Sequence, residues 1–341
     1  MSATADAPTD YFRTIEEHDV HGATDLILEL LHQGTPMTTI TQEVIAPAQV
    51  RVGQLWASGS WSVADEHAAT SITEGALSAL THAAIPRRGA HSRHVAVACV
   101  EGEWHSLPAR MAAAVAGSTG EARVTMLGPS LPPEQLHRRL SAGDIDVLAL
   151  SCTMPTNLIG AARCIAAAHD LDVPVIVGGL AFGHSSHRAR ALGADGWAVD
   201  PGALLGPLPD LAAPSSEMSS EVLLLDAVDD AIIALAYDRM VGAFPRLSQM
   251  TPYQQARTRE DLRWMARFAA GALLTNDASI VEDLLTWLCV RLHEMVPAAV
   301  ITTSAQLLAE TLEPQAHLGA AILRGAAVKV EMDMTGSEHD H

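Results

Sequence analysis

A histidine stands shortly after the first strand that the sequence predicts. The β-branched and apolar run Val95–Val100 stops at Glu101, and His105 follows in a short turn before an apolar segment of helical period begins at Pro108. This order of strand, loop and helix places the imidazole at the carboxyl end of a strand, where open α/β sheets bind their ligands. An isolated Glu-x-His tripeptide is more often a plain surface loop, so the rest of the chain must decide between the two interpretations.

Polar and small residues close two later strands of the same region. Ser151 and Thr153 end the third apolar run, and Gly178 and Gly179 end the fourth. Glycines at a strand end let a ligand approach the backbone closely, although a Gly-Gly pair taken alone is more often an ordinary tight turn. Because the carboxyl ends of parallel strands meet at one sheet edge, we expect these residues and His105 to line one site.

A second group of residues that could do chemistry lies earlier in the chain. Trp56 ends one predicted helix, Glu66 and His67 occupy the first turn of the next, and Trp61 lies in the short connection. A large ring, a carboxylate and an imidazole therefore meet at one end of a helical bundle. The simpler interpretation is that the tryptophan plugs the bundle end and that the helix dipole favours the acid.

The elements that must position these residues fall into three segments, and the fold class is α/β plus all-α. Residues 1–92 predict a helical bundle, residues 93–213 alternate strands with helices, residues 214–330 are helical throughout, and residues 331–341 form an acidic tail expected to be disordered. The strands of the middle segment are continuous apolar runs, which predict a five-stranded, doubly wound, flavodoxin-like (Rossmann-like) domain. The helices expected in the flanking segments are Asp10–Gln33, Thr41–Trp56, Ser62–Ile85, Ser220–Phe244, Arg257–Leu274, Ser279–Met295, Thr303–Leu312 and Gln315–Val328.

Composition excludes several classes of function. Forty acidic residues against 21 basic ones give a formal charge of −19, so phosphate backbones are repelled and nucleic-acid binding is not expected. The four cysteines form no C-x-x-C pair, which favours a reduced, cytoplasmic compartment. The first residues do not resemble a signal peptide, and no apolar run is long enough to span a membrane.

The helical motif resembles the cap of the cobalamin-binding family, in which a four-helix cap precedes a flavodoxin-like corrinoid domain. The cap motif of that family is Trp, nine residues, then Glu-His, and here it stands as Trp56, Glu66 and His67. This cap belongs to the light-sensing, adenosylcobalamin-dependent branch of the family. The resemblance implies that Trp56 packs over the upper face of the cofactor against the adenosyl group, and that photolysis of the cobalt–carbon bond disturbs the cap.

The corrinoid-domain motif of the same family is an acid, one residue, His, two residues and Gly. It stands here as Glu103 and His105, with Pro108 in place of the glycine, and proline suits the first turn of the following helix. The resemblance covers about residues 10–210. It implies that His105 is the lower axial ligand of cobalt, replacing the cofactor's own nucleotide base, while Glu103 holds the other ring nitrogen. The displaced nucleotide tail is then expected to run into the sheet between the Ser-x-Thr and Gly-Gly motifs, which are Ser151, Thr153, Gly178 and Gly179.

One helix of the last segment carries a row of cations. Three arginines fall at i, i+4 and i+8 beside two aromatic residues; these are Arg259, Arg263, Arg267, Trp264 and Phe268. Such a row is more often a solvated face paired with acids such as Glu260 and Asp261. The alternative is that it clamps the carboxylates of a planar ligand, in a domain short of other basic residues.

The order of domains resembles the photocobilins, which carry B12 beside a non-enzymatic biliverdin-binding domain of helical, globin-like character. This resemblance implies a light sensor, not an enzyme, that holds adenosylcobalamin and biliverdin and signals through a homo-oligomer or a partner effector protein. Covalent bilin attachment at Cys289 is an option that the resemblance does not require. Two alternatives stay open. One is a corrinoid methyl carrier of a methyltransferase system, which the bulky cap disfavours; the other is a haem-binding globin-like domain with His293 or His317 as ligand.

Overall fold

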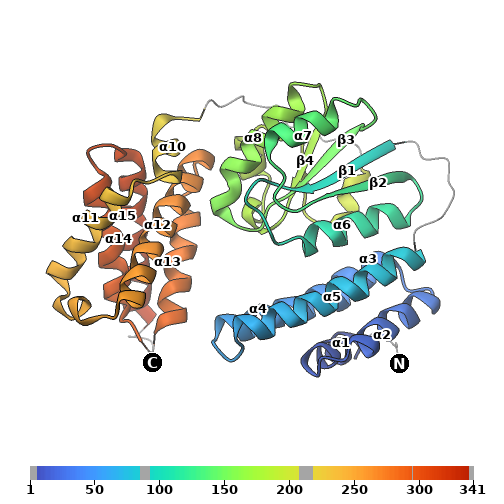
Figure 1. Cartoon of the computed structure of the whole chain (residues 1–341), viewed down its shortest axis with the longest axis horizontal. Helices are drawn as coiled ribbons and strands as arrows, with labels where there is room; N and C mark the ends of the chain where they lie inside the picture. Colours follow the sequence, from blue (N-terminus) through green and yellow to red (C-terminus); the bar gives the residue numbers. More distant parts are fainter. Residues whose placement is uncertain (1–5, 85–92, 207–217, 294, 338–341) are drawn as a thin grey trace. The chain divides into compact units, whose positions relative to one another are not determined.

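Five parallel strands form the central sheet of the α/β region in the computed structural model, which describes residues 6–84, 93–206, 218–293 and 295–337 (Figure 1). The strand order is β2-β1-β3-β4-β5, which confirms the predicted five-stranded doubly wound sheet. All residues of β3, and all of β1 except Arg93, are buried, as continuous apolar runs require when helices cover both faces. The strands are β1 (Arg93–Cys99), β2 (Ala122–Gly128), β3 (Val147–Ser151), β4 (Val175–Gly178) and β5 (Gly196–Ala198).

Helices and short 3₁₀ turns connect the strands. In Figure 1, α6 lies on one side of the sheet and α7 and α8 lie on the other. Pro108 falls within the first turn of α6, where its missing N–H has no intrahelical partner to lose, so the proline is compatible with the helix start. The elements are α6 (Leu107–Ser118), α7 (Pro133–Leu140), η2 (Pro155–Asn157), α8 (Leu158–His169), η3 (Leu180–Phe182), α9 (His187–Ala191) and η4 (Pro201–Leu205).

The amino-terminal segment is the predicted helical cap. Its core is built from fully buried side chains such as Tyr11, Ile27 and Leu80, and it also includes Leu107 and Met111 of α6. The cap therefore shares one hydrophobic core with the first helix of the α/β region. Its elements are α1 (Ala7–Glu16), α2 (Val20–His32), α3 (Met37–Thr39), the π-helical segment η1 (Ile40–Ile45), α4 (Ala46–Ala57) and α5 (Val63–Ala84).

Two of the helices predicted for the cap differ from those observed. The expected single helix Asp10–Gln33 is two helices, because His18 takes a φ of 56° and Asp19 then caps α2 by accepting the Gly22 N–H at 2.9 Å. The second expected helix begins earlier, at Met37. A π-helical stretch lies just before Pro47, and this wider turn fits a residue that cannot donate a backbone hydrogen bond.

The carboxyl-terminal region belongs to a second compact unit, which is helical. This unit comprises Met154–Ala162, Leu180–Gly193 and Ala212–His341. Within it, the buried Arg188 of α9 donates to Asp277 at 2.8 Å and to Ser279 at 3.1 Å. None of the helices that the structure describes is long and apolar enough to cross a membrane. The helices are α10 (Ser220–Asp226), α11 (Asp230–Ala243), η5 (Pro245–Gln249), α12 (Pro252–Thr275), α13 (Ser279–Leu292), α14 (Ala298–Leu312) and α15 (His317–Ser337).

Two predictions for this region were wrong. The expected helix Ser220–Phe244 is broken after Asp226, because Asp229 leaves the helical conformation and caps α11 by accepting the Ala231 N–H at 2.6 Å. The acidic tail was expected to be disordered from residue 331, but α15 continues to Ser337; residues 338–341 lie outside the described part of the chain. The globin-like character of this all-α region stays a prediction.

Candidate functional site

His105 lies directly beyond β1 and is held by the carboxylate of Glu103. Glu103 Oε1 accepts a hydrogen bond from the His105 backbone N–H at 2.9 Å and lies 2.5 Å from the ring nitrogen Nδ1. Glu103 is fully buried, whereas the His105 side chain is 60% exposed. Because a carboxylate can only accept, Nδ1 carries the proton, and Nε2 of the neutral ring keeps a lone pair for a metal ion. The hydrogen bond to Glu103 raises the pKa of His105, although burial opposes it.

The second oxygen of Glu103 ties the histidine loop to a neighbouring strand. Oε2 accepts the backbone N–H of Thr153, just beyond β3, at 2.7 Å. One buried carboxylate thus joins the loops that follow β1 and β3. The Thr153 hydroxyl is itself buried and has no hydrogen-bond partner within the described part of the chain. A buried hydroxyl left unpaired is costly, so Thr153 Oγ1 is a polar group that a ligand at this sheet edge would satisfy.

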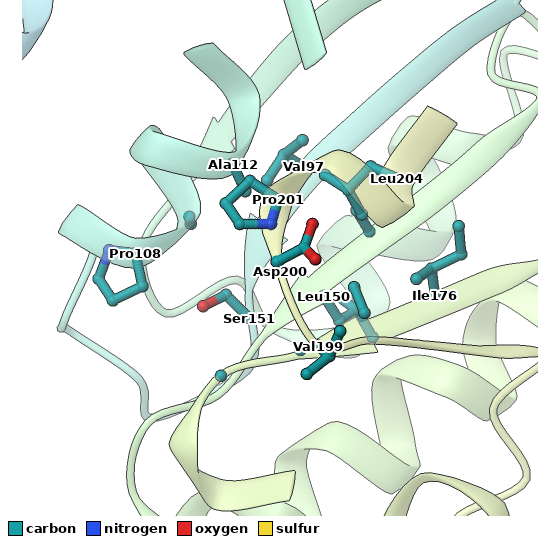
Figure 2. Close-up of a pocket in the computed structure, with 15 residues that line it drawn as sticks. Val97, Pro108, Ala112, Leu150, Ser151, Ile176, Val199, Asp200, Pro201 and Leu204 are labelled. Atoms are coloured by element: carbon teal, nitrogen blue, oxygen red, sulfur yellow. The ribbon is translucent and has the colours of Figure 1, made fainter. Parts of the chain in front are cut away.

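A cavity of about 140 Å³ opens at the carboxyl ends of the strands. Figure 2 shows Ser151, Pro108 and Asp200 around it. Gly178 and Gly179 also line it, so Ser151 and the Gly-Gly pair meet at one cavity as predicted, whereas His105 and Thr153 are not among its lining residues. Most of the remaining wall is small and apolar, which suits a flat organic group: Val97, Ala109, Ala112, Ala149, Leu150, Ile176, Ala198, Val199, Pro201 and Leu204.

Backbone packing excludes a side chain at Gly179 and leaves little room for one at Gly178. Gly179 has a φ of 100°, and a Cβ atom there would overlap the backbone carbonyl of Cys152. A Cβ atom on Gly178 would lie 3.3 Å from the carbonyl oxygen of Ala198. The pair is therefore more than an ordinary tight turn, because side chains here would push apart the strand ends that shape the cavity.

Sequence reasoning missed part of the cavity wall. Ala109 and Ala112 lie three residues apart on α6, and Asp200 follows β5 with its side chain accepting the Gly202 N–H at 2.8 Å. Asp200 could have been predicted, because it follows the fifth strand just as the other predicted site residues follow theirs. The two alanines carried no such signal, since nothing distinguishes cavity-lining alanines from the many other alanines of this chain.

The two tryptophans at the end of the cap have different environments. Trp61 is partly buried, packs against the cap core and stacks on Phe12 with ring centroids 6.0 Å apart. Trp56, in the last turn of α4, is 39% exposed. Trp61 is therefore the tryptophan that fills the end of the helical bundle. Trp56 is therefore the tryptophan whose large ring stays partly exposed at the end of α4.

Glu66 and His67 lie in the first turn of α5, as predicted, behind a reciprocal capping box of Ser62 and Asp65. Glu66 Oε1 accepts the Thr70 hydroxyl at 2.9 Å, and its other oxygen lies 3.6 Å from His67 Nε2. The charge of Glu66 contributes to the raised pKa of His105, so the two groups interact electrostatically. The carboxylate of the cap motif thus lies within electrostatic range of the strand-end histidine.

Two of the three arginines in the row on α12 are paired with acids, but not with those expected. Arg263 Nη2 lies 2.5 Å from Asp230 of α11, and Arg267 Nε lies 3.4 Å from Asp226 of α10. The guanidinium of Arg259 lies 4.1 Å from the centroid of the Tyr237 ring. The expected partner Glu260 instead binds Arg257 at 2.6 Å. Trp264 and Phe268 lie together with ring centroids 6.2 Å apart.

The cysteine and the two histidines considered as ligand-binding residues in the helical unit all have protein surroundings that occupy them. Cys289 is 1% exposed, and burial raises the pKa of its thiol. A thiol in this state is a weak nucleophile, which disfavours covalent attachment of a ligand. The two histidines considered for haem lie apart in the chain: His293 Nδ1 is 2.9 Å from the Val290 carbonyl oxygen, and His317 Nδ1 is 2.9 Å from Glu221.

Two family models match the regions that contain these residues. Both are described as a B12 binding domain; one matches residues 9–81 and the other matches residues 93–205. The first range holds Trp56, Glu66 and His67, and the second holds Glu103 and His105. The chain therefore contains a helical and a Rossmann-like B12-binding domain.

A curated relative is the HTH-type transcriptional repressor CarH of Myxococcus xanthus, 35% identical over 136 residues; the match covers 40% of this chain and 44% of CarH, less than half its length. Solved structures that match part of the chain include the monomethylamine corrinoid protein of Methanosarcina barkeri, with 18% identity and a TM-score of 0.49 over 56% of this chain and 92% of that one. A cobalamin-binding protein of Desulfitobacterium hafniense DCB-2 has 19% identity and a TM-score of 0.30 over 56% and 91% of the two chains.

Proposed function

Because the chain contains a two-part B12-binding region, we propose that it is a light sensor that uses adenosylcobalamin. The observation that carries the proposal is the bonded group Glu103–His105–Thr153 at the sheet edge, which leaves the Nε2 lone pair of an exposed imidazole free. A neutral imidazole nitrogen of this kind would be able to coordinate cobalt in place of the cofactor's own nucleotide base. The similarity to CarH and the Trp–Glu-His cap favour the light-sensing branch over other corrinoid proteins.

The residues present fit the cofactor. Nε2 of His105 would bind cobalt, and Glu103 fixes the tautomer and orientation of the ring. The apolar cavity lined by Ser151 and Gly179 would take the nucleotide tail. When bound, adenosylcobalamin supplies a cobalt–carbon bond that visible light breaks.

The cap residues would respond to the breaking of the cobalt–carbon bond. Trp56 offers a large, partly exposed ring to the adenosyl group, while Glu66 and His67 offer polar contacts from the first turn of α5. Trp56 would lose contact area if the adenosyl group left, and the packing of the cap around Trp56 would then change. We propose that this shift changes the conformation or the oligomeric state of the protein and so signals to further copies of the chain or to an effector protein.

We further propose biliverdin as a second chromophore of the helical unit. Arg263 and Arg267, beside Trp264, would hold its propionates, exchanging their present carboxylate partners Asp230 and Asp226 for those of the ligand. Burial of Cys289 favours non-covalent attachment. The net charge of −19 argues against DNA as the output partner, and no enzymatic role is proposed.

The test is reconstitution of the full chain in the dark with adenosylcobalamin, with and without biliverdin. We expect the absorption spectrum of a His-ligated cobalamin, and a change in spectrum and in mass by light scattering after green illumination. His105→Ala should lose the His-ligated spectrum while the apoprotein keeps its circular dichroism. A protein that binds methylcobalamin and adenosylcobalamin equally well, and that does not change conformation or mass in light, would instead be a corrinoid carrier.

A further inference from the structure

The residue after the histidine is bonded to the cap. The Ser106 hydroxyl donates to Glu74 Oε1 of α5 at 2.7 Å, and Ser106 is only 8% exposed. Glu74 lies two turns beyond Glu66 on the same helix. A hydrogen bond to an ionised carboxylate is among the stronger ones in proteins. Helix α5 of the cap is therefore attached directly to the loop that carries His105.

Because of this bond, the Ser106 side chain does not cap its own helix. Ser106 is the N-cap residue of α6, where a serine side chain ordinarily accepts a backbone N–H of its own helix, but it makes no such bond here. Its hydroxyl binds the cap instead. One turn later on α6, Arg110 Nε lies 3.7 Å from the same Glu74 oxygen. Glu74 thus bridges the first turns of α6 through two side chains.

The two sides of His105 are consequently fixed by different parts of the structure. On the strand side, Glu103 binds the backbone and ring of the histidine. On the helix side, Glu74 binds Ser106, and Leu107 is buried in the hydrophobic core of the cap. The backbone of His105 is therefore held between its own bond to Glu103 and the bond of the next residue to α5.

We propose that Glu74 is a positioning residue for the cobalt ligand: by holding Ser106, it sets the placement of His105. This rests on the proposed function, in which His105 is the axial ligand. Because α5 also carries Glu66 and His67, one helix joins the residues assigned to the upper face of the cofactor to the loop that supplies the lower ligand. A displacement of the cap that breaks the Glu74–Ser106 bond would shift His105 and so weaken its binding to cobalt.

The test measures axial ligation directly on the full chain. Protein labelled with ¹⁵N-histidine is loaded with cob(II)alamin, and its electron paramagnetic resonance spectrum is recorded; a histidine ligand gives a nitrogen doublet in place of the triplet from ¹⁴N. In Glu74→Ala and Ser106→Ala, the ratio of His-ligated to unligated cofactor should fall about tenfold, the effect of losing one hydrogen bond to a charged group. Glu74→Gln keeps an acceptor for the serine hydroxyl and should restore most of the doublet.

Control variants make the result specific. Glu43→Ala removes an exposed carboxylate of the cap and should leave the doublet unchanged. The double variant Glu74→Ala/Ser106→Ala should lose no more ligation than Glu74→Ala alone, since the serine acts only through its bond to Glu74; additive losses would overturn the proposal. If Glu74→Ala does not fold, Ser106→Ala and Glu74→Gln carry the test.

The proposal and the function on which it rests fail in different ways. A wild-type spectrum without a histidine doublet refutes axial ligation by the protein, and with it the proposed cofactor site. A wild-type doublet that His105→Ala removes, but that Glu74→Ala and Ser106→Ala leave intact, refutes only the positioning role of Glu74.

Discussion

The substitution Glu103→Gln removes one charge from the centre of the site and changes almost no volume. Glu103 is fully buried, and its two oxygens accept from the His105 backbone, the His105 ring and the Thr153 backbone. A glutamine has only one oxygen, so its NH₂ group must face donors on one side. If it faces Thr153, two N–H donors oppose each other. If it faces His105, it opposes the backbone N–H of His105, and the ring must also take its other tautomer, with the proton on Nε2.

The expected loss of stability follows from these opposed N–H donors. Leaving one buried donor unsatisfied costs about 1–3 kcal/mol, more when the lost acceptor was charged, so the apoprotein should lose about that much stability. The second arrangement also blocks Nε2, the nitrogen that would bind cobalt. We therefore expect Glu103→Gln to lower both the free energy of unfolding and the His-ligated fraction of bound cobalamin.

The assay is urea unfolding of the apoprotein together with the visible spectrum of the cobalamin-loaded protein. Glu101→Gln is the matched control, because it makes the same chemical change two residues earlier at a side chain that is 38% exposed and 3.5 Å from Arg163. An exposed pair of this kind contributes little to stability. If the two variants unfold at the same urea concentration and show the same spectrum, the argument from the buried carboxylate is refuted.

Three further predictions test other parts of the site. Gly179→Ala should destabilise the fold by more than about 2 kcal/mol and weaken cobalamin binding, because its φ of 100° and its closeness to a backbone carbonyl both exclude a side chain. An unchanged melting temperature of the apoprotein in calorimetry would contradict this. Trp56→Ala should weaken the binding of adenosylcobalamin by more than about 1 kcal/mol relative to the binding of hydroxocobalamin, since only the former offers an adenosyl group to the ring. Equal losses of affinity in titrations of the two cobalamins would argue against a contact with the adenosyl group. Replacing Arg263 and Arg267 together by Gln should weaken biliverdin at least about tenfold in full-length protein; stoichiometric uptake of haem with no uptake of bilin would support the haem alternative instead.

The sequence by itself predicted most of the architecture. Continuous apolar runs predicted the parallel strands, and because parallel strands end at one edge, they also predicted that the Ser-x-Thr and Gly-Gly motifs would meet. These inferences succeed because hydrophobic periodicity is local and a doubly wound sheet brings strand ends together whatever its side chains are. They failed where a single residue ended a helix, as His18 does between α1 and α2.

Tertiary structure decided which groups are bonded to which. That Glu103 reaches Thr153, that Glu74 of the cap reaches Ser106, and that Arg263 pairs with Asp230 of another helix could not be read from the sequence. Each pair joins residues that are 32 to 50 positions apart in the chain. A carboxylate can accept from many donors, and its partner is chosen by which surfaces pack together when the helices bury their apolar faces.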